Sequence, residues 1–337
     1  MKLAKTIITT MLGMLFAMNL FGADNSIYID QTGSNSTISI TQDGAGNKIG
    51  GLTLNSPSDL NRAILKGDSQ TISINQIGSG NSLQMNIQTT NQSGNTNTNN
   101  STTFGNNSGF GNSAGNNYSY SATGNNNTAV IDSNSAGASG GSDSNNLGVD
   151  IQGNSNTTNF GINGTSNTII ATIGTQNATS SSNTLNSVVN GSNNQQTIKI
   201  GGGNSNTVNV YQGLNASLSS NIPSPPASGN NLNGLDSVVT SGSTSDNSVA
   251  TLTLSGGSNN VNLGQVGTGE SATMNITGNS NGVNVTQNGS NDTFVLDLTG
   301  SSSIMNVTQT SSGGNTNTLN IKSAGNSNTF TINQTAH

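Results

Sequence analysis

The chain has 337 residues, of which 29% are hydrophobic, 3% are aromatic and 6% are charged, with a net charge of −6 and no cysteine. This stock of apolar side chains is too small for a layered globular core of the usual size, and the low charge is unlike an ordinary disordered chain. The seven Lys and Arg residues argue against a nucleic-acid-binding surface. Order must therefore come from backbone pairing and stacked Asn, Ser, Thr and Gly residues.

Residues 1–23 have the three parts of a secretory signal peptide. Two lysines precede an apolar run over residues 7–21, and the small residues Gly22 and Ala23 follow it. This run is shorter than the ~20 apolar residues that a membrane-spanning helix needs. The sequence therefore predicts a secreted protein whose mature chain starts near Asp24, without a lipid-attachment cysteine or disulfides.

Residues 24–88 introduce a seven-residue phrase in which a polar residue precedes two aliphatics at alternate positions and a final glutamine. The phrase occurs eight times in the chain, and its first three copies are Asn25–Gln31, Ser36–Gln42 and Gln70–Gln76. Alternate residues of a strand share one face, so each copy predicts a strand with its aliphatics and glutamine inward and Ser, Thr or Asn outward. Residues 48–67, which contain a proline and three of the basic residues, are predicted to form an insert.

The middle of the chain carries the phrase poorly. Residues 89–146 are rich in Asn, Ser and Gly and hold few aliphatics, so degenerate repeats and disorder both stay open. The absence of a charge cluster or proline run there favours degenerate repeats. Residues 147–213 carry the phrase loosely. Residues 214–246 contain three prolines, which cannot donate to a strand ladder, and are predicted to form a second insert.

Residues 247–337 form the most regular block. Gln265, Gln287 and Gln309 are separated by 22 residues each, and Gln334 follows after 25. Between them lie second strands that end in Gly or Ser rather than Gln. Two strands joined by arcs rich in Gly, Asn and Ser make one rung of about 22 residues. The sequence therefore predicts an all-β, flattened β-solenoid with two inserts.

Stacked rungs at the usual strand spacing of ~4.8 Å would place the glutamines above one another. A primary amide has two donors and an acceptor, so identical amides can bond along the stack, whereas a buried unpaired amide costs about 1–3 kcal/mol. The residues predicted to form this ladder are Gln31, Gln42, Gln76, Gln212, Gln265, Gln287, Gln309, Gln334, Asn25, Asn206, Asn281 and Asn328. The glycines predicted to reverse the chain are Gly33, Gly44, Gly46, Gly78, Gly80, Gly267 and Gly289.

Two arcs, Gln42–Asn47 and Gln76–Asn81, read Gln-x-Gly-x-Gly-Asn between apolar strands. This sequence pattern resembles the curlin repeats of bacterial curli fibre subunits. The resemblance is good in the two end blocks and poor in the middle. The chain departs from the pattern by its length, its two inserts and the frequent loss of the second strand's glutamine. The resemblance implies a secreted protein that assembles into extracellular amyloid-type fibres for surface adhesion and biofilm matrix. It also implies that the protein binds further copies of itself, with a fibre nucleator and outer-membrane secretion machinery as further candidate partners.

Catalytic chemistry finds little support in the chain. His337 is the one histidine and there is no cysteine, which removes the usual nucleophile–base pairs and nitrogen- or sulfur-rich metal sites. Asp292 and Asp297 make a weak pair for glycoside hydrolysis, and the carboxylates are interpreted as sharing no repeat frame. We therefore expect no enzyme activity, cofactor, metal, nucleic acid or small-molecule substrate.

A solenoid surface or phage fibre that binds a glycan or another surface without polymerising is the alternative function. Thr-x-Thr pairs such as Thr251/Thr253 could form a flat ice- or glycan-binding face, but they do not recur in every rung. The phrase begins at Asn25 and ends at Gln334, with no capping helix, charge cluster or proline expected in the end rungs. Unprotected strand edges of low charge predict growth by stacking into cross-β fibres.

Overall fold

The computed structural model describes residues 25–32, 36–43, 45–50, 63–66, 71–79, 82–88, 101–104, 113–114, 117–124, 126–133, 144–174, 180–214, 243–312 and 314–337. Within these ranges the regular elements are β-strands, which pair in parallel in two sheets and stack as a β-solenoid. The predicted all-β solenoid is therefore confirmed. No helix in these ranges is long and apolar enough to cross a membrane. The predicted signal peptide lies outside the described residues.

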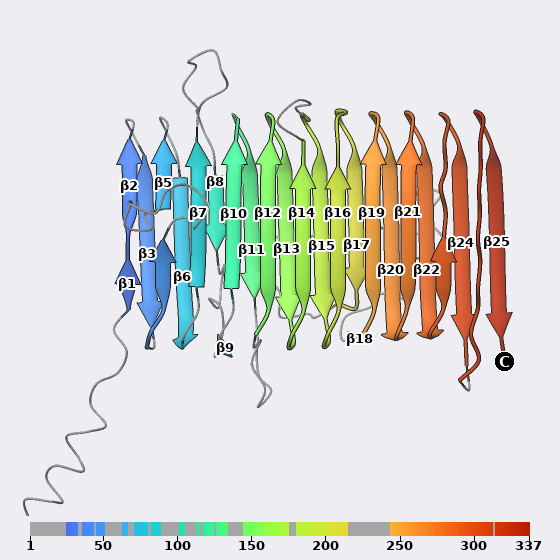
Figure 1. Cartoon of the computed structure of the whole chain (residues 1–337), viewed down its shortest axis with the longest axis horizontal. Coiled ribbons are helices and arrows are strands. Elements are labelled where there is room, and N and C mark those ends of the chain that lie inside the picture. The colour runs from blue at the N-terminus through green and yellow to red at the C-terminus, as the bar shows by residue number, and fades with distance from the viewer. Residues whose placement is uncertain are drawn as a thin grey trace, which may run out of the picture.

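From β10 to β24, apart from the short β18, the strands alternate between the two sheets along the chain, and one strand from each sheet makes a rung (Figure 1). Sheet A contains β1 (Ser26–Ile27), β2 (Ile29–Thr32), β4 (Lys48–Gly50), β5 (Ala63–Lys66), β7 (Ser82–Gln88), β10 (Asn117–Thr123), β12 (Asn146–Gln152), β14 (Thr168–Ile173), β16 (Gln195–Ile200), β19 (Val249–Ser255), β21 (Ser271–Thr277) and β23 (Thr293–Val295). Sheet B contains β3 (Thr37–Asp43), β6 (Thr71–Ser79), β8 (Ser101–Phe104), β9 (Ser113–Ala114), β11 (Thr128–Ser133), β13 (Thr157–Asn163), β15 (Thr184–Asn190), β17 (Thr207–Gln212), β18 (Ser245–Asp246), β20 (Asn260–Thr268), β22 (Gly282–Ser290), β24 (Ile304–Ser311) and β25 (Thr329–Ala336).

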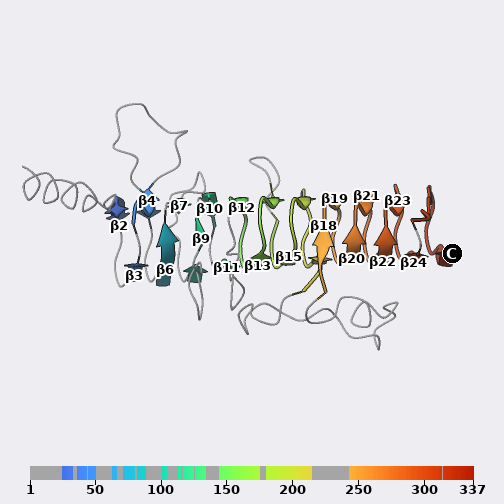
Figure 2. The same ribbon diagram turned by 90° about the horizontal axis from the view of Figure 1, so that it is seen from below.

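The rungs stack in chain order along the long axis of the molecule. Figure 2 separates the two layers, with β19, β21 and β23 in one and β20, β22 and β24 in the other. Equivalent positions of the phrase pair directly, so that Gln265 pairs with Gln287, and Gln287 with Gln309. A two-residue periodicity with one buried face excludes a slip by one residue, because that slip would turn every aliphatic to the solvent.

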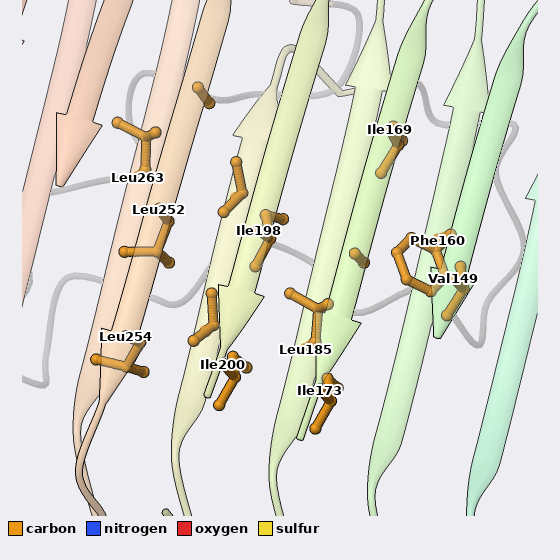
Figure 3. Close-up of a cluster of buried hydrophobic side chains, with 14 of the residues drawn as sticks. Val149, Phe160, Ile169, Ile173, Leu185, Ile198, Ile200, Leu252, Leu254 and Leu263 are labelled. Carbon is orange, nitrogen blue, oxygen red and sulfur yellow. The ribbon is translucent and has the colours of Figure 1, made fainter. Parts of the chain in front are cut away.

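The core is a thin apolar layer between the sheets. The strands of sheet A alternate between buried and more exposed residues, as β12 and β19 show, and in these two strands the buried set is aliphatic. Figure 3 shows Ile169, Ile198 and Leu252 of sheet A lying in this layer with Leu185 and Leu263 of sheet B. Burial of each such side chain contributes about 1.5–3 kcal/mol, so many small rungs together compensate for the low apolar content of the chain.

The predicted insert over residues 48–67 is shorter in the structure. Its ends form β4 and β5, which pair with the two halves of the first rung's strand in sheet A. The two segments are therefore one strand that is interrupted by residues 51–62, which lie outside the described residues. The reason is local composition, since Ile49 and Ala63 supply buried side chains at core positions.

The second predicted insert also begins and ends at the stack. The Leu214 N–H donates to the Ser243 carbonyl over 2.9 Å, and β18 pairs with the arc end of β20. Residues 215–242, which include the prolines, lie outside the described residues. In the low-complexity stretch 89–146, β10 and β11 pair in register with β12 and β13, so this part of it continues the stack.

Candidate functional site

The glutamines of the phrase form a continuous hydrogen-bonded column inside the C-terminal half of the solenoid. Each Nε2 donates to the Oε1 of the glutamine in the next rung, always in the direction of the C-terminus. The bonds from Gln212 to Gln265, Gln265 to Gln287, Gln287 to Gln309 and Gln309 to Gln334 are 2.8 to 3.0 Å long. All of these side chains except that of Gln334, which is half-buried, are fully buried.

The same amides also connect the two sheets. The Nε2 atoms of Gln287 and Gln309 each donate over 2.9 Å to a backbone carbonyl of sheet A, that of Ser271 and that of Thr293. Gln265 makes the equivalent bond to the Val249 carbonyl over 3.2 Å. Because both amide hydrogens are used, glutamine closes the edge of the core without leaving a buried donor unpaired.

The N-terminal glutamines behave differently. Gln42 is half-buried and its backbone pairs with that of Gln76, whose side chain lies outside the described residues. Gln31 does not join a glutamine column, so its assignment to the ladder was wrong. It lies in sheet A, is exposed, and pairs with Leu65 in the next rung. The reason is that Gln31 occupies the last inward position of a sheet A strand, and later rungs carry an aliphatic residue there.

A second amide column precedes the strands of sheet B. In this column the Nδ2 of each asparagine donates to the Oδ1 of the asparagine one rung earlier, over 2.9 to 3.1 Å. The same Oδ1 also accepts a backbone N–H of the next rung. The column contains Asn127, Asn156, Asn183, Asn206, Asn259 and Asn281. Asn328 stacks on Ser303 instead, with its N–H donating to the serine Oγ over 3.2 Å.

Asn25 belongs to a matching column at the other arc, which precedes the strands of sheet A. Its Oδ1 accepts the Asn47 N–H over 2.9 Å. Farther along, the column passes through Asn145, Asn167, Asn194, Ser248, Glu270, Asp292 and Asn317. The sequence reading that the carboxylates share no frame is therefore wrong for Glu270 and Asp292, which occupy successive positions of one column.

A third column lies outside the core, on the outer side of sheet B, and sequence reasoning did not identify it. The residues at its rungs are Asn159, Asn186, Asn209, Asn262, Asn284 and Asn306, bonded by side-chain amides over 2.6 to 2.8 Å. From Asn209 onward they stand between the two apolar residues of the phrase. Recurrence of Asn at that one position was the available signal. A position that only needed a polar residue facing the solvent would vary between Ser, Thr and Asn.

The arcs depend on two conformational positions. At Gly267, φ is +123° and an added Cβ would lie 1.9 Å from the carbonyl oxygen of Gly289 in the next rung. Glycine is therefore required there for close stacking as well as for chain reversal. Gly289 and Gly46 also have positive φ, and Gly78 lies within β6. Gly33, Gly44 and Gly80 lie outside the described residues.

The residue immediately before the asparagine columns also has positive φ, which sequence reasoning had assigned to glycine. This position is usually serine, with φ of 60° at Ser205, 56° at Ser258 and 57° at Ser280. A left-handed serine costs about 1 kcal/mol, and the regular hydrogen bonds of the following asparagine offset it. The Gly-x-Ser-Asn sequence of these arcs was the signal that could have indicated it.

The outermost described rungs leave strand edges and apolar side chains accessible. β25 pairs with β24 along one edge, and among the described residues no strand pairs with its other edge. Phe330 on β25 is 39% exposed, and Ile27 and Tyr28 in the first rung are 47% and 50% exposed. Unpaired edges of this kind are templates for further strands.

A protein-family model described as Curlin associated repeat matches residues 21–44, which include the first described rung, β1 to β3. The match confirms the identification of curlin-like repeats and suggests a curli-like structural protein. No curated protein and no solved structure matches the chain.

Proposed function

We propose that this protein is a secreted structural subunit that stacks with further copies of itself into extracellular amyloid-type fibres, serving surface adhesion and biofilm matrix. The observation that carries the proposal is the self-complementarity of the rung. Every rung in the C-terminal block offers the next one the same edge, with backbone groups, aliphatics and amides at identical positions. A rung at the end of the stack offers this same edge to another chain.

The direction of the glutamine column gives the stacking a polarity. Each glutamine from Gln212 to Gln309 donates to the glutamine on its C-terminal side, so that every bond of the column points the same way. A second copy added with its strands parallel to β25 continues the column, because its first sheet B strand brings Gln42 to the level of Gln334. A copy added in the inverted direction would place donor against donor or acceptor against acceptor along the column. Low charge and the absence of proline from these strands favour growth of this kind.

The curlin repeat match supports the extracellular, adhesive part of the proposal. The proposal assigns the chain no catalytic role, and its strands present mostly Thr, Ser and Asn outward rather than a convergent set of acids and bases. Further copies of the chain are the proposed partner. A nucleator that presents a first rung, and an outer-membrane secretion system, are the other partners that the resemblance implies.

The test is assembly of the exported protein purified in denaturant and refolded by dilution. We expect a lag, then thioflavin-positive fibrils with a meridional cross-β reflection near ~4.7 Å. Addition of a small amount of sonicated fibrils should abolish the lag, because preformed rungs replace nucleation. Fibril-free controls with an unrelated β-solenoid of similar length would exclude a general effect of the dye.

A chain that stays monomeric for days at high concentration while its β-structure is protected from hydrogen exchange would contradict the proposal. That result would favour the non-polymerising surface or phage fibre, whose function would then lie in binding a glycan or another surface. Glycan-array binding by the monomer, retained without any assembly, would distinguish this outcome.

A further inference from the structure

Two acidic residues interrupt the asparagine column at the arcs before sheet A. Glu270 and Asp292 are both 0% exposed and lie in successive rungs, immediately before β21 and β23. Buried acids are rare unless they are paired with a cation or bonded by donors. The other residues of this column are mostly asparagines. Their hydrogen bonds therefore show which bonds a side chain at this position makes.

Asn167 shows the pattern of this column. Its Nδ2 donates to Asn145 Oδ1 over 3.1 Å and to the Gly191 carbonyl over 2.9 Å. Its Oδ1 accepts the backbone N–H and the Nδ2 of Asn194 over 2.9 and 3.1 Å. Each position therefore needs an acceptor towards the next rung and a donor towards the previous rung.

The two acids meet only half of this requirement. Asp292 Oδ1 accepts the backbone N–H and the Nδ2 of Asn317 over 2.8 and 3.1 Å, and Glu270 Oε2 accepts the Asp292 N–H over 2.9 Å. These oxygens act as the Oδ1 of asparagine does. The second oxygens, Glu270 Oε1 and Asp292 Oδ2, are buried without a hydrogen-bond partner. Because aspartate has the shape of asparagine, Asp292 Oδ2 takes the position of a group that must donate.

We propose that Glu270 and Asp292 form a buried proton-binding site, in which a shared proton replaces an amide hydrogen of the asparagine column at neutral pH. The proton lets one carboxyl donate to the other, or to a neighbouring carbonyl, as Nδ2 does elsewhere. Loss of the proton leaves two buried negative charges one rung apart, about 4.8 Å along the stack. Burial and mutual repulsion both oppose that state.

Among the residues that the structure describes, none supplies a cation bonded to the ionised pair. The flanking positions of the column, Ser248 and Asn317, are uncharged. Asp246, on the preceding rung, accepts the Ser192 N–H with its Oδ1 over 2.7 Å. On the outer side of sheet A, the charged groups near these rungs are Asp297 and Lys322, which pair with each other over 3.3 Å. Burial first, and the Asp292 carboxyl second, raises the pKa of Glu270 to about 8.

The sign of the pH dependence follows from this direction. A carboxyl whose pKa is higher in the folded chain than in the unfolded chain favours folding most below its unfolded pKa, which is 4.5 for Glu270. This contribution is lost progressively as the pH rises through the interval up to about 8. For one proton, the ratio of folded to unfolded rungs falls by up to about tenfold per pH unit in that interval.

The experiment measures hydrogen exchange of the full exported chain as a dilute, unassembled monomer between about pH 5 and about pH 9, with exchange rates corrected for intrinsic pH dependence. We expect protection of β20 to β24 to fall steeply with rising pH, while β13 to β17 change less. The double variant Glu270→Gln/Asp292→Asn restores amides and should flatten this profile. Asp297→Asn, at an exposed acid of the same region, is the matched control and should leave it unchanged.

A double variant that keeps the alkaline loss, or a wild-type chain without one, would overturn the assignment. Recovery of protection at alkaline pH on addition of calcium alone would also overturn it, in favour of a cation site. If the double variant does not fold, carboxyl-carbon NMR titration of the wild-type chain decides the question. A buried carboxyl that titrates above pH 6 supports a protonated site, and acids that all titrate at ordinary values exclude it. The measurement uses unassembled chains, so its result is independent of fibre formation.

Discussion

Replacement of one ladder glutamine by a residue of similar size tests whether the amide column stabilises the solenoid. Gln287→Leu keeps the volume and the apolar stem but removes every polar contact of the amide. Gln287 donates to Gln309 Oε1 over 3.0 Å and to the Ser271 and Asp292 carbonyls over 2.9 and 3.0 Å. It also accepts from Gln265 Nε2 over 2.8 Å.

The magnitude follows from the groups that the substitution leaves behind. Gln309 Oε1 and the Ser271 carbonyl lose their donor inside the core, and each buried unpaired group costs about 1–3 kcal/mol. Gln265 Nε2 keeps its bond to the Val249 carbonyl, so its loss is partial. Greater hydrophobicity of leucine offsets part of the total. We expect a net loss of about 2–4 kcal/mol in the free energy of opening the rungs around β22.

Hydrogen exchange is the suitable assay, because a repeat protein opens locally and a single unfolding free energy is poorly defined. A loss of about 2–4 kcal/mol corresponds to exchange that is faster by about 30- to 800-fold for the protected amides of β20, β22 and β24. Gln195→Leu is the matched control, since Gln195 is exposed on the outer side of β16. We expect that variant to change protection by less than about 0.5 kcal/mol. Equal effects of the two substitutions would refute the assignment of the ladder as a stabilising element.

Three further outcomes are expected. Gly267→Ala should destabilise its rung by about 2–4 kcal/mol in the same exchange assay, because the new Cβ meets the Gly289 carbonyl oxygen and φ is unfavourable; an unaffected rung would mean that the arcs relax freely. Lys322→Ala should change stability by less than about 0.5 kcal/mol, since the Lys322–Asp297 pair is exposed; a larger loss in thermal unfolding would contradict this. Mass spectrometry of the natural exported protein should show a chain starting near Asp24, and an intact initiator methionine would disprove the signal peptide.

The parts of the fold that follow a strict period could be predicted from the sequence. The spacing of 22 residues between Gln265, Gln287 and Gln309 predicts the length of a rung. It also predicts the parallel register, because side-chain direction alternates along a strand. Gln31 shows the limit of the same reasoning. Its phrase matches the others, yet it lies in sheet A, where later rungs place aliphatics at that position. The phrase alone does not state which sheet a copy enters.

Other features were missed because residues were compared by chemical class rather than by position. Glu270 and Asp292 share a frame with asparagines, and the frame becomes visible only when an acid is allowed to stand in an amide position. The strand formed by β4 and β5 was missed for a different reason. Its two halves are separated in sequence, and only the pairing of both with one neighbouring strand, β7, shows that they are continuous.

The amide columns also explain how a chain of such low complexity keeps one register. A slip of one rung's strand by two residues would keep aliphatics inward, so the hydrophobic pattern alone does not forbid it. The same slip would move Gln287 onto Leu263 or Gly267 and leave its amide, and the amides of Gln265 and Gln309, without their partners along the column. At about 1–3 kcal/mol for each buried unpaired group, the slipped arrangement is strongly disfavoured. The aliphatics therefore stabilise the stack, and the glutamines determine its register. The same hydrogen bonds would set the register of a second copy that joins the stack.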